Sequence, residues 1–429
     1  SEVIIPLEGG DEVRLSMQTR REIVWKESKG YNKLSKKEKM ARLDSVVAVT
    51  GYNRDYASRL LSIQDKSTYV KDGSSGRSYR LVADARKAKK RPRRKKKYDE
   101  EVLEILKKIW VIMDFPCGKR LAPCMSWLVP KLEAFGEIEI GSYEVRKKLL
   151  SISAASIDRL LKGEKRKLSL KKRKSTKPGS LLKDQISVRT FADWDDAKVG
   201  FMEMDLVSHE GGNPSGEYAF TLTLTDVCSG WTENRAVKNR AQKWTFEAIN
   251  LIRERLPFSL KGLDSDNDST FINAHLFRYC EENEITFTRS RVGNKNDGCY
   301  VEQKNWSVVR RTVGYARHDT EEEVKILNEI YEVLRLYVNL FQPTAKLMRK
   351  ERHGAKVKKT YDTPKTPCQR LLSSPDVSED VKVQLQQSFD ELNPAALKRE
   401  INRLLRKLER AYLKKKADIE QCEKEPVFA

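Results

Sequence analysis

Hydrophobic and polar residues in the central part of the chain alternate first with the period of strands and then with mixed periods. Three strands come first, joined by short polar turns: residues 200–207, 217–226 and 231–237. Helices and strands then follow one another: residues 243–256 (helix), 259–263 (strand), 271–280 (helix) and 285–288 (strand). This order predicts a mixed five-stranded sheet in which the first strand is central.

Helical spacing also marks two units before the sheet. The first has two helices on either side of Gly51, which suits a tight turn: residues 38–50 and 53–63. The second has four helices: residues 99–113, 125–135, 145–150 and 154–161. Both have the shape of a helix-turn-helix, although three-helix units are also common as plain packing modules. We expect four exposed residues of these units to contact DNA: Arg54, Arg59, Ser156 and Arg159.

The end of the chain carries a hydrophobic stripe. After a long helix over 321–340, a last helix begins at Asn393 and Pro394 and has apolar residues at three-four spacing: Leu397, Ile401, Leu404, Leu408 and Ala411. The stripe must be buried, either against the chain's own sheet domain or against another subunit.

The chain is strongly basic, and its positive charge is clustered. A length of 429 residues favours several domains, and a net charge of +22 favours an anionic partner. Two Lys/Arg-rich stretches, 86–97 and 166–190, are predicted to be linkers that contact DNA phosphates, although a solvated tether or a nuclear-localisation signal would look similar. The linker residues expected at DNA are Arg86, Lys89, Arg91, Arg93, Arg94, Lys95, Lys96, Lys171, Lys172 and Arg173.

Three carboxylates carry the candidate chemistry. Asp205 lies in the central strand, Asp266 follows the fourth strand, and Glu302 lies in the first turn of a helix after a Gly/Asn-rich loop. Breaking a phosphodiester requires that charge on its oxygens be neutralised, which two divalent cations achieve. Mg²⁺ prefers oxygen ligands and is usually held by one or two protein carboxylates. We predict that all three residues are catalytic and bind metal.

The three motifs resemble the D,D-35-E signature of the retroviral-integrase-type transposases, which include many bacterial insertion-sequence transposases. Thirty-five residues separate Asp266 from Glu302, and the resemblance covers residues 195–345. It implies a DNA transposase that uses two Mg²⁺ ions, for which Mn²⁺ can substitute, to cut element ends and transfer their 3′ hydroxyls to target DNA. It also implies double-stranded DNA as partner and a homodimer or larger oligomer, because transposition joins two ends.

The expected fold is multidomain, with all-α helix-turn-helix domains, a central α/β ribonuclease-H-like core and a helical C-terminal tail. The expected boundaries are 1–85 (first helix-turn-helix domain), 86–97 (basic linker), 98–165 (second helical DNA-binding domain), 166–190 (basic linker), 191–345 (catalytic core) and 346–429 (extended segment and amphipathic helix).

Neighbouring carboxylates have simpler interpretations. Asp264, Asp266 and Asp268 have the spacing of a calcium loop, but the glycine that such a loop needs is missing. We expect Asp264 and Asp268 to be a turn residue and a helix cap. Glu203 shares a strand face with Asp205 and could assist it, but solvent exposure is the expectation.

The helix of Glu302 offers further DNA contacts. Lys304 and Asn305 are the first-turn candidates for phosphate contact, and Arg310 follows on the same helix. Trp306 stands where related enzymes often have a basic residue. Stacking on a flipped base and packing in the core both remain open for it.

Cysteine and histidine usage excludes one domain of the related integrases. The seven Cys and four His show no metal-ligand spacing, so their His-His-Cys-Cys zinc domain is expected to be absent. Unpaired cysteines, together with the lack of a signal peptide or a long apolar span, predict the cytoplasm, in the bacterial cytosol or nucleoid.

Two other functions remain as alternatives. One is an inactive or domesticated DNA-binding regulator that keeps the integrase fold, which the intact carboxylate triplet argues against. The other is a ribonuclease-H-type nuclease, which would more naturally use a fourth carboxylate and would not need two helix-turn-helix units.

Overall fold

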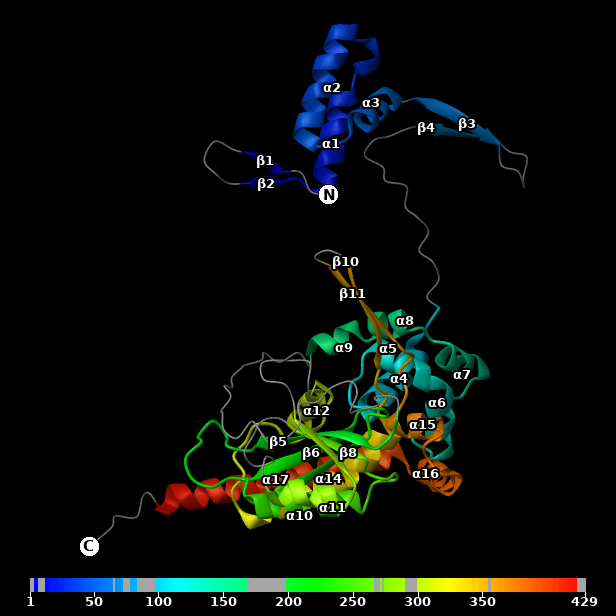
Figure 1. Cartoon of the computed structure of the whole chain (residues 1–429). Coiled ribbons are helices and arrows are strands. Elements are labelled where there is room, and N and C mark those ends of the chain that lie inside the picture. Colours follow the sequence, from blue (N-terminus) through cyan, green and yellow to red (C-terminus); the bar gives the residue numbers. More distant parts are fainter. Residues whose placement is uncertain are drawn as a thin grey trace. The chain divides into compact units, whose positions relative to one another are not determined.

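The computed structural model describes residues 4–6, 12–64, 66–71, 78–82, 97–167, 198–265, 271, 274–289, 299–353 and 356–422. The chain divides into two compact units, Ser1–Lys96 and Lys97–Ala429 (Figure 1). The first is mainly helical, and the second contains the sheet. Among the described residues, no helix is both long enough and apolar enough to cross a membrane.

Three helices build the first unit: α1 (Met17–Ser28), α2 (Lys36–Thr50) and α3 (Arg54–Ile63), with a 3-10 turn, η1 (Tyr31–Lys33). Their core consists of Val24, Tyr31, Leu43, Val46, Ala57 and Leu61. Ser35 and Glu38 form a capping box at the start of α2. Gly51 ends α2 with a φ of 63°, a left-handed value that favours glycine. Both predicted helices are confirmed, and their role as a DNA-reading helix-turn-helix stays a prediction.

The expectation that the N-terminal region is all-α was wrong, because this unit also contains two β-hairpins. β1 (Ile4–Pro6) pairs with β2 (Glu12–Arg14), and β3 (Ser67–Lys71) pairs with β4 (Ser78–Val82). These strands are only three and five residues long, too short for an alternating pattern to stand out.

A five-stranded sheet organises the second unit in the order β7-β6-β5-β8-β9. Its strands are β5 (Phe201–Ser208), β6 (Phe220–Asp226), β7 (Thr232–Val237), β8 (Gly262–Ser265) and β9 (Thr286–Arg289). β5, β6 and β7 are antiparallel, and β8 and β9 run parallel to β5. The predicted mixed sheet with a central first strand is confirmed, and its strand order is that of a ribonuclease-H-like core.

The two faces of the sheet differ in polarity. One buries Met202 and Met204 of β5 together with α10 (Gln242–Arg253) and α11 (Ala274–Glu282). On the other face, Val207 packs with residues of α14 (Glu321–Leu336). Side chains alternate between the faces of a strand, so Glu203 and Asp205 share the face of Val207.

A helical bundle precedes the sheet and packs against it: α4 (Glu100–Ile112), α5 (Gly118–Leu121), η2 (Ala122–Cys124), α6 (Met125–Ala134), α7 (Tyr143–Leu150), α8 (Ala154–Leu160) and α9 (Lys162–Lys167). The Tyr337 hydroxyl donates to the Ile112 carbonyl at 2.6 Å, and Arg120 Nε donates to the Pro343 carbonyl at 2.6 Å. The helices assigned to a second DNA-binding domain thus share one compact body with the sheet.

The C-terminal region is not an extended segment, and this part of the prediction was wrong. After the π-helical turn η4 (Tyr337–Phe341), the chain forms a hairpin and three helices: β10 (Leu347–His353), β11 (Lys356–Tyr361), α15 (Pro367–Leu372), α16 (Glu379–Glu391) and α17 (Pro394–Cys422). Lys and Arg occupy both alternating sets of positions in the hairpin, which hides its strand period. The stripe of α17 is buried against the chain's own α14 through Ile401, Leu404 and Leu408.

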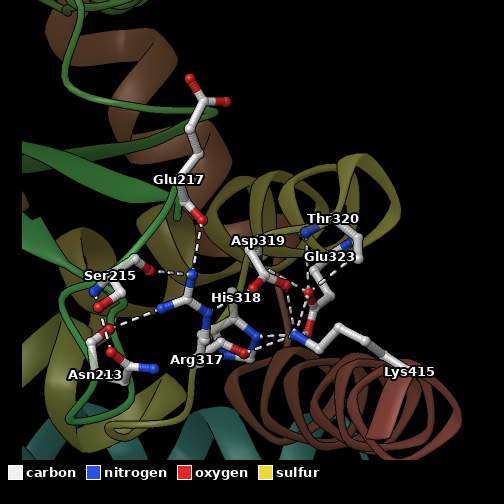
Figure 2. A network of polar contacts seen from close by, with 9 residues as sticks. All are labelled: Asn213, Ser215, Glu217, Arg317, His318, Asp319, Thr320, Glu323 and Lys415. Atoms are coloured by element: carbon white, nitrogen blue, oxygen red, sulfur yellow. Dashed lines mark hydrogen bonds and ion pairs between the residues drawn. The ribbon is translucent and has the colours of Figure 1, made fainter. Parts of the chain in front are cut away.

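A polar network joins the loop after β5 to α14 and α17 (Figure 2). Arg317 donates to three carbonyl oxygens of that loop, at 2.7 to 3.0 Å: Asn213, Ser215 and Glu217. Buried Glu323 accepts from His318 Nδ1 at 3.0 Å and from Lys415 Nζ at 2.9 Å. The network therefore fixes the loop after β5 and the C-terminal part of α17 to the N-terminal end of α14.

His209 is buried beside this network. Its Nε2 lies 2.7 Å from Thr221 Oγ1, and its ring centre lies 5.6 Å from that of His318. Burial, reinforced by His318 and Arg310, lowers the pKa of His209 to about 3. Burial alone would raise the pKa of Glu323, but hydrogen bonds from His318 and neighbouring donors lower it to about 2.

Acid should destabilise the second unit through His209. Unfolded chains protonate this histidine near its ordinary pKa of 6.5, and the folded chain does so only near 3. The unfolded state then binds more protons between these values, so the free energy of unfolding falls as the pH falls, by at most about 1.4 kcal/mol per pH unit.

Urea unfolding followed by near-UV circular dichroism measures this dependence between pH 6.5 and pH 4.5, and comparison with a His209→Gln variant separates the contribution of His209 from those of other titrating groups. The His209→Gln variant, which can still bond Thr221, should show a flatter dependence. Equal slopes for the two proteins would contradict this assignment.

Candidate active site

Strand β5 holds two carboxylates on one face at the centre of the sheet. Asp205 is half-buried, and the register places it beside Thr223 of β6. Glu203, two residues earlier, is 1% exposed. β5 pairs with β6 over residues 202–208 and with β8 over residues 201–204, so the backbone that carries both carboxylates is fixed by the sheet.

Helix α12 (Cys299–Lys304) carries Glu302 to this face. Glu302 is exposed in the first turn, and the helix continues as the π-helical turn η3 (Asn305–Arg310) and α13 (Arg311–Val313). Asn305 Nδ2 donates to Asp205 Oδ2 at 2.6 Å. This bond joins the residue one turn after Glu302 directly to the carboxylate of the central strand. Such π turns are frequent at functional sites.

Glu203 fixes the start of the same helix. Its Oε2 accepts hydrogen bonds from the backbone amides of Tyr300 at 2.8 Å and Val301 at 3.0 Å. A carboxylate at a helix N-terminus satisfies free amides and opposes the positive end of the helix dipole. The expectation of solvent exposure for Glu203 was wrong, because α12 covers this face of β5. The alternation placed Glu203 beside Asp205 in the sequence but could not show what covers it.

The second carboxylate motif is described only in part. Asp266 and Asp268 lie outside the described residues, immediately after β8 ends at Ser265. Asp264 is not a turn residue as predicted. It lies within β8, is 1% exposed and accepts a hydrogen bond from Thr288 Oγ1 at 2.6 Å. The register pairs Asp264 with Glu203 on the neighbouring strand.

The donor set suits a hard cation. Asp205 and Glu302 offer carboxylate oxygens, which Mg²⁺ prefers, and the exposed Glu302 can be approached from solvent. Over the residues that the structure describes, which omit Asp266, no three His, Cys, Asp or Glu side chains come close enough to form a metal site by themselves.

The other candidates on this helix lie in different surroundings. Lys304 is 6% exposed, and burial lowers its pKa to about 7. Arg310 is half-buried, with its guanidinium 4.8 Å from the Tyr315 ring centre. Trp306 is 50% exposed, which excludes a fully packed core position. Asn305 bonds Asp205 and so has a partner within the protein.

The helix-turn-helix candidates are partly accessible. Arg59 and Arg159 are exposed, and Arg54 pairs with Asp44. Ser156 is buried, contrary to prediction, and its hydroxyl accepts a hydrogen bond from Ser153 at the start of α8. The candidates of the basic linkers lie outside the described residues: Arg86, Lys89, Arg91, Arg93, Arg94, Lys95, Lys96, Lys171, Lys172 and Arg173.

Sequence analysis missed one basic element, the β10–β11 hairpin. Residues 346–361 contain seven Lys or Arg and a single acidic residue, Glu351. The density of basic residues was the available signal.

The chain is 39% identical to the uncharacterized protein y4rM of Sinorhizobium fredii over 357 residues. These residues make up 83% of this chain and 96% of that protein. No protein-family model matches the chain. Among solved structures, the magnesium complex of the HTLV-2 integrase catalytic core is 12% identical, with a TM-score of 0.26 over 34% of this chain and 88% of that one. The BIV integrase core is 15% identical, with a TM-score of 0.24 over 33% and 83%. At these scores the strand order of the sheet, not the likeness, identifies the fold.

Replacing Glu203 by Gln should loosen the start of α12. Hydrogen bonds to a charged acceptor contribute about 1.5 to 3 kcal/mol, so the amides of Tyr300 and Val301 should lose roughly ten- to hundredfold of their protection from hydrogen exchange. Mass spectrometry of a peptide spanning α12 measures this. Glu302→Gln is the matched control, because the Glu302 side chain is exposed, and it should leave the protection unchanged. Unchanged protection in Glu203→Gln would show that its carboxylate does not anchor the helix.

Proposed function

The chain belongs to the family of the Sinorhizobium fredii y4rM protein, and we propose that it is a DNA transposase. It would cut the ends of a mobile element and transfer their 3′ hydroxyls to target DNA by direct transesterification, in the bacterial cytosol. One observation supports this most: hydrogen bonds on both sides of Glu302 tie its helix to the strand of Asp205. The ribonuclease-H-like strand order provides the matching scaffold.

Asp205, Asp266 and Glu302 are proposed to hold two Mg²⁺ ions, which when bound would neutralise charge on the attacking and leaving oxygens. Asn305 holds one oxygen of Asp205 through its amide, which orients that carboxylate. Glu203 would act as a positioning residue, because it fixes the helix on which Glu302 and Asn305 lie. Glu302 is exposed and so lies where a large DNA substrate can reach it.

DNA recognition is proposed to be divided among several elements. The helix-turn-helix of the first unit would read bases through Arg54 and Arg59, and the basic linkers would contact phosphates without sequence preference. Two element ends must be held together for joining, so we propose a homodimer or larger assembly on double-stranded DNA. The buried part of α17 already packs on its own α14, which leaves other surfaces for that contact.

A ribonuclease-H-type nuclease is the second candidate, and the buried Asp264 beside Glu203 is the observation that favours it, since it adds a carboxylate to this face. Its hydrogen bond from Thr288 argues for a structural role instead. Strand joining distinguishes the two functions, because a hydrolase releases its product and a transposase transfers it.

Asp205→Asn and Glu302→Gln should abolish hydrolysis and strand joining in Mg²⁺ while leaving DNA binding unchanged. Losing one anionic ligand removes stabilisation of the transition state, and about 4 kcal/mol corresponds to roughly a thousandfold in rate. Gel assays of cleavage and joining, with anisotropy for binding, measure both. Asp380→Asn on α16, an exposed carboxylate far along the chain, is the control and should retain activity. Joining at a normal rate by Asp205→Asn would refute the assignment.

Replacing the ten Lys and Arg residues of 86–97 with Gln and Ser should weaken binding to element ends and random duplex alike. The slope of log affinity against log salt should become shallower by about 0.9 for each DNA phosphate that the altered stretch no longer neutralises. A solvated tether predicts an unchanged slope. Weaker binding confined to element ends would instead mean that this stretch reads sequence or shape.

A further inference from the structure

A groove lies beside the helix of Glu302, within the second unit. Its volume is about 980 Å³, and its lining comes from the helical bundle near Arg120, the continuous helix α12–η3–α13, the end of α14 with η4, strand β11 and helix α17. Gln303, Lys304, Trp306 and Ser307 line it. The groove therefore opens along the very helix that carries the proposed catalytic glutamate.

The groove has more positive charge than its own carboxylates can balance. Six cations line it: Lys119, Arg120, Lys304, Arg311, Lys359 and Lys398. Its two carboxylates are Asp114 and Asp362. Asp114 already pairs with Arg311 and Lys398, and Asp362 pairs with Arg370 outside this set. Over the part of the chain that the structure describes, four of the lining cations have no carboxylate within ion-pair distance.

Two of these four cations are partly or largely shielded from water. Lys304 is 6% exposed and forms no hydrogen bond with a described residue. The half-buried guanidinium of Arg120 reaches only neutral acceptors, the Pro343 carbonyl at 2.6 Å and the Gln342 side chain at 3.2 Å. Burying a charge without a counter-charge is costly. An anion in the groove would supply the missing partner for both.

Two exposed aromatic side chains also line the groove. Trp306 from η3 is 50% exposed and Tyr361 from β11 is 52% exposed, although both are large and apolar. Cations that follow a phosphate backbone, combined with aromatic rings on which bases stack, are the features of single-strand nucleic acid sites. In a duplex every base face except those of the terminal pairs is covered by stacking, so these rings favour unpaired nucleotides.

We propose that this groove binds an unpaired DNA strand next to the catalytic helix. Its phosphates would lie against Lys304 and Arg120, and its bases against Trp306 and Tyr361. The inference rests on the proposed function, in that DNA is the substrate, and adds to it that the substrate has unpaired nucleotides beside the site of cleavage.

The test measures binding to a duplex with a single-stranded overhang and to the matching blunt duplex, by fluorescence anisotropy in EDTA so that no cleavage occurs. The full-length protein should prefer the overhang. Trp306→Leu and Tyr361→Leu should each reduce that preference about tenfold, because each removes a stacking surface. Lys304→Met, of similar size, should reduce the salt slope for the overhang by about 0.7, as for one single-strand phosphate. A 2-aminopurine base in the overhang should change its fluorescence on binding, and Trp306→Leu should remove that change.

Two control variants lie outside the groove. Tyr143→Leu removes a tyrosine that is 75% exposed, and a triple change of Arg406, Arg410 and Lys414 to Gln removes exposed charge from α17. Both should keep the preference for the overhang. Thermal unfolding of each variant shows that it is folded.

Equal binding of blunt and overhung duplex by the unaltered protein would overturn the inference. Equal loss of blunt and overhung binding in the groove variants, or tighter binding of an RNA overhang, would do the same. If strand joining depends on Asp205 but no preference for an overhang exists, only the groove assignment fails. If the preference depends on the groove residues but no joining occurs, the groove assignment stands and the transposase proposal fails.

Discussion

The carboxylate of Glu203 is the interaction on which the arrangement of the site depends. Glu203 is buried in the central strand, and its carboxylate accepts hydrogen bonds from the first free backbone amides of α12. These bonds join the sheet directly to the helix of Glu302. Asn305 adds a second tie, one turn later, to Asp205. With both ties, the exposed Glu302 needs no packing of its own to be positioned. This leaves its side chain accessible to solvent.

A buried carboxylate can join the sheet to α12 because one face of the sheet is apolar and the other is polar. Methionines and leucines on one face pack with α10 and α11 to form a dry core. The opposite face carries Glu203, Asp205 and Asp264, and each has a hydrogen-bond donor: a helix amide, an asparagine or a threonine. Buried polar groups are tolerated when they are paired, so this face can be both stable and chemically useful.

The remaining elements of the second unit pack around the helix formed by α12 and η3 as well as around the sheet. The helical bundle, the β10–β11 hairpin and α17 meet α12 and η3 around a groove whose cations outnumber its carboxylates. The buried stripe of α17 packs on α14, and hydrogen bonds of Arg120 and Tyr337 join the helical bundle to the segment around η4. These contacts hold the elements around the groove in place. Binding surfaces of this kind arise where several elements meet, so no single stretch of sequence encodes them.

The sequence by itself determined the order of strands and helices in the sheet domain, because turn residues separate apolar segments whose spacing changes from that of strands to that of helices. It also determined that Glu203 and Asp205 share a face, since strand side chains alternate. Only the tertiary structure decided that α12 covers Glu203, that Asp264 stays within β8, and that Ser156 is buried, because covering depends on residues far away in the chain. The basic hairpin and the groove were likewise decided by packing, since charge clusters in a sequence show where cations are but not what they face.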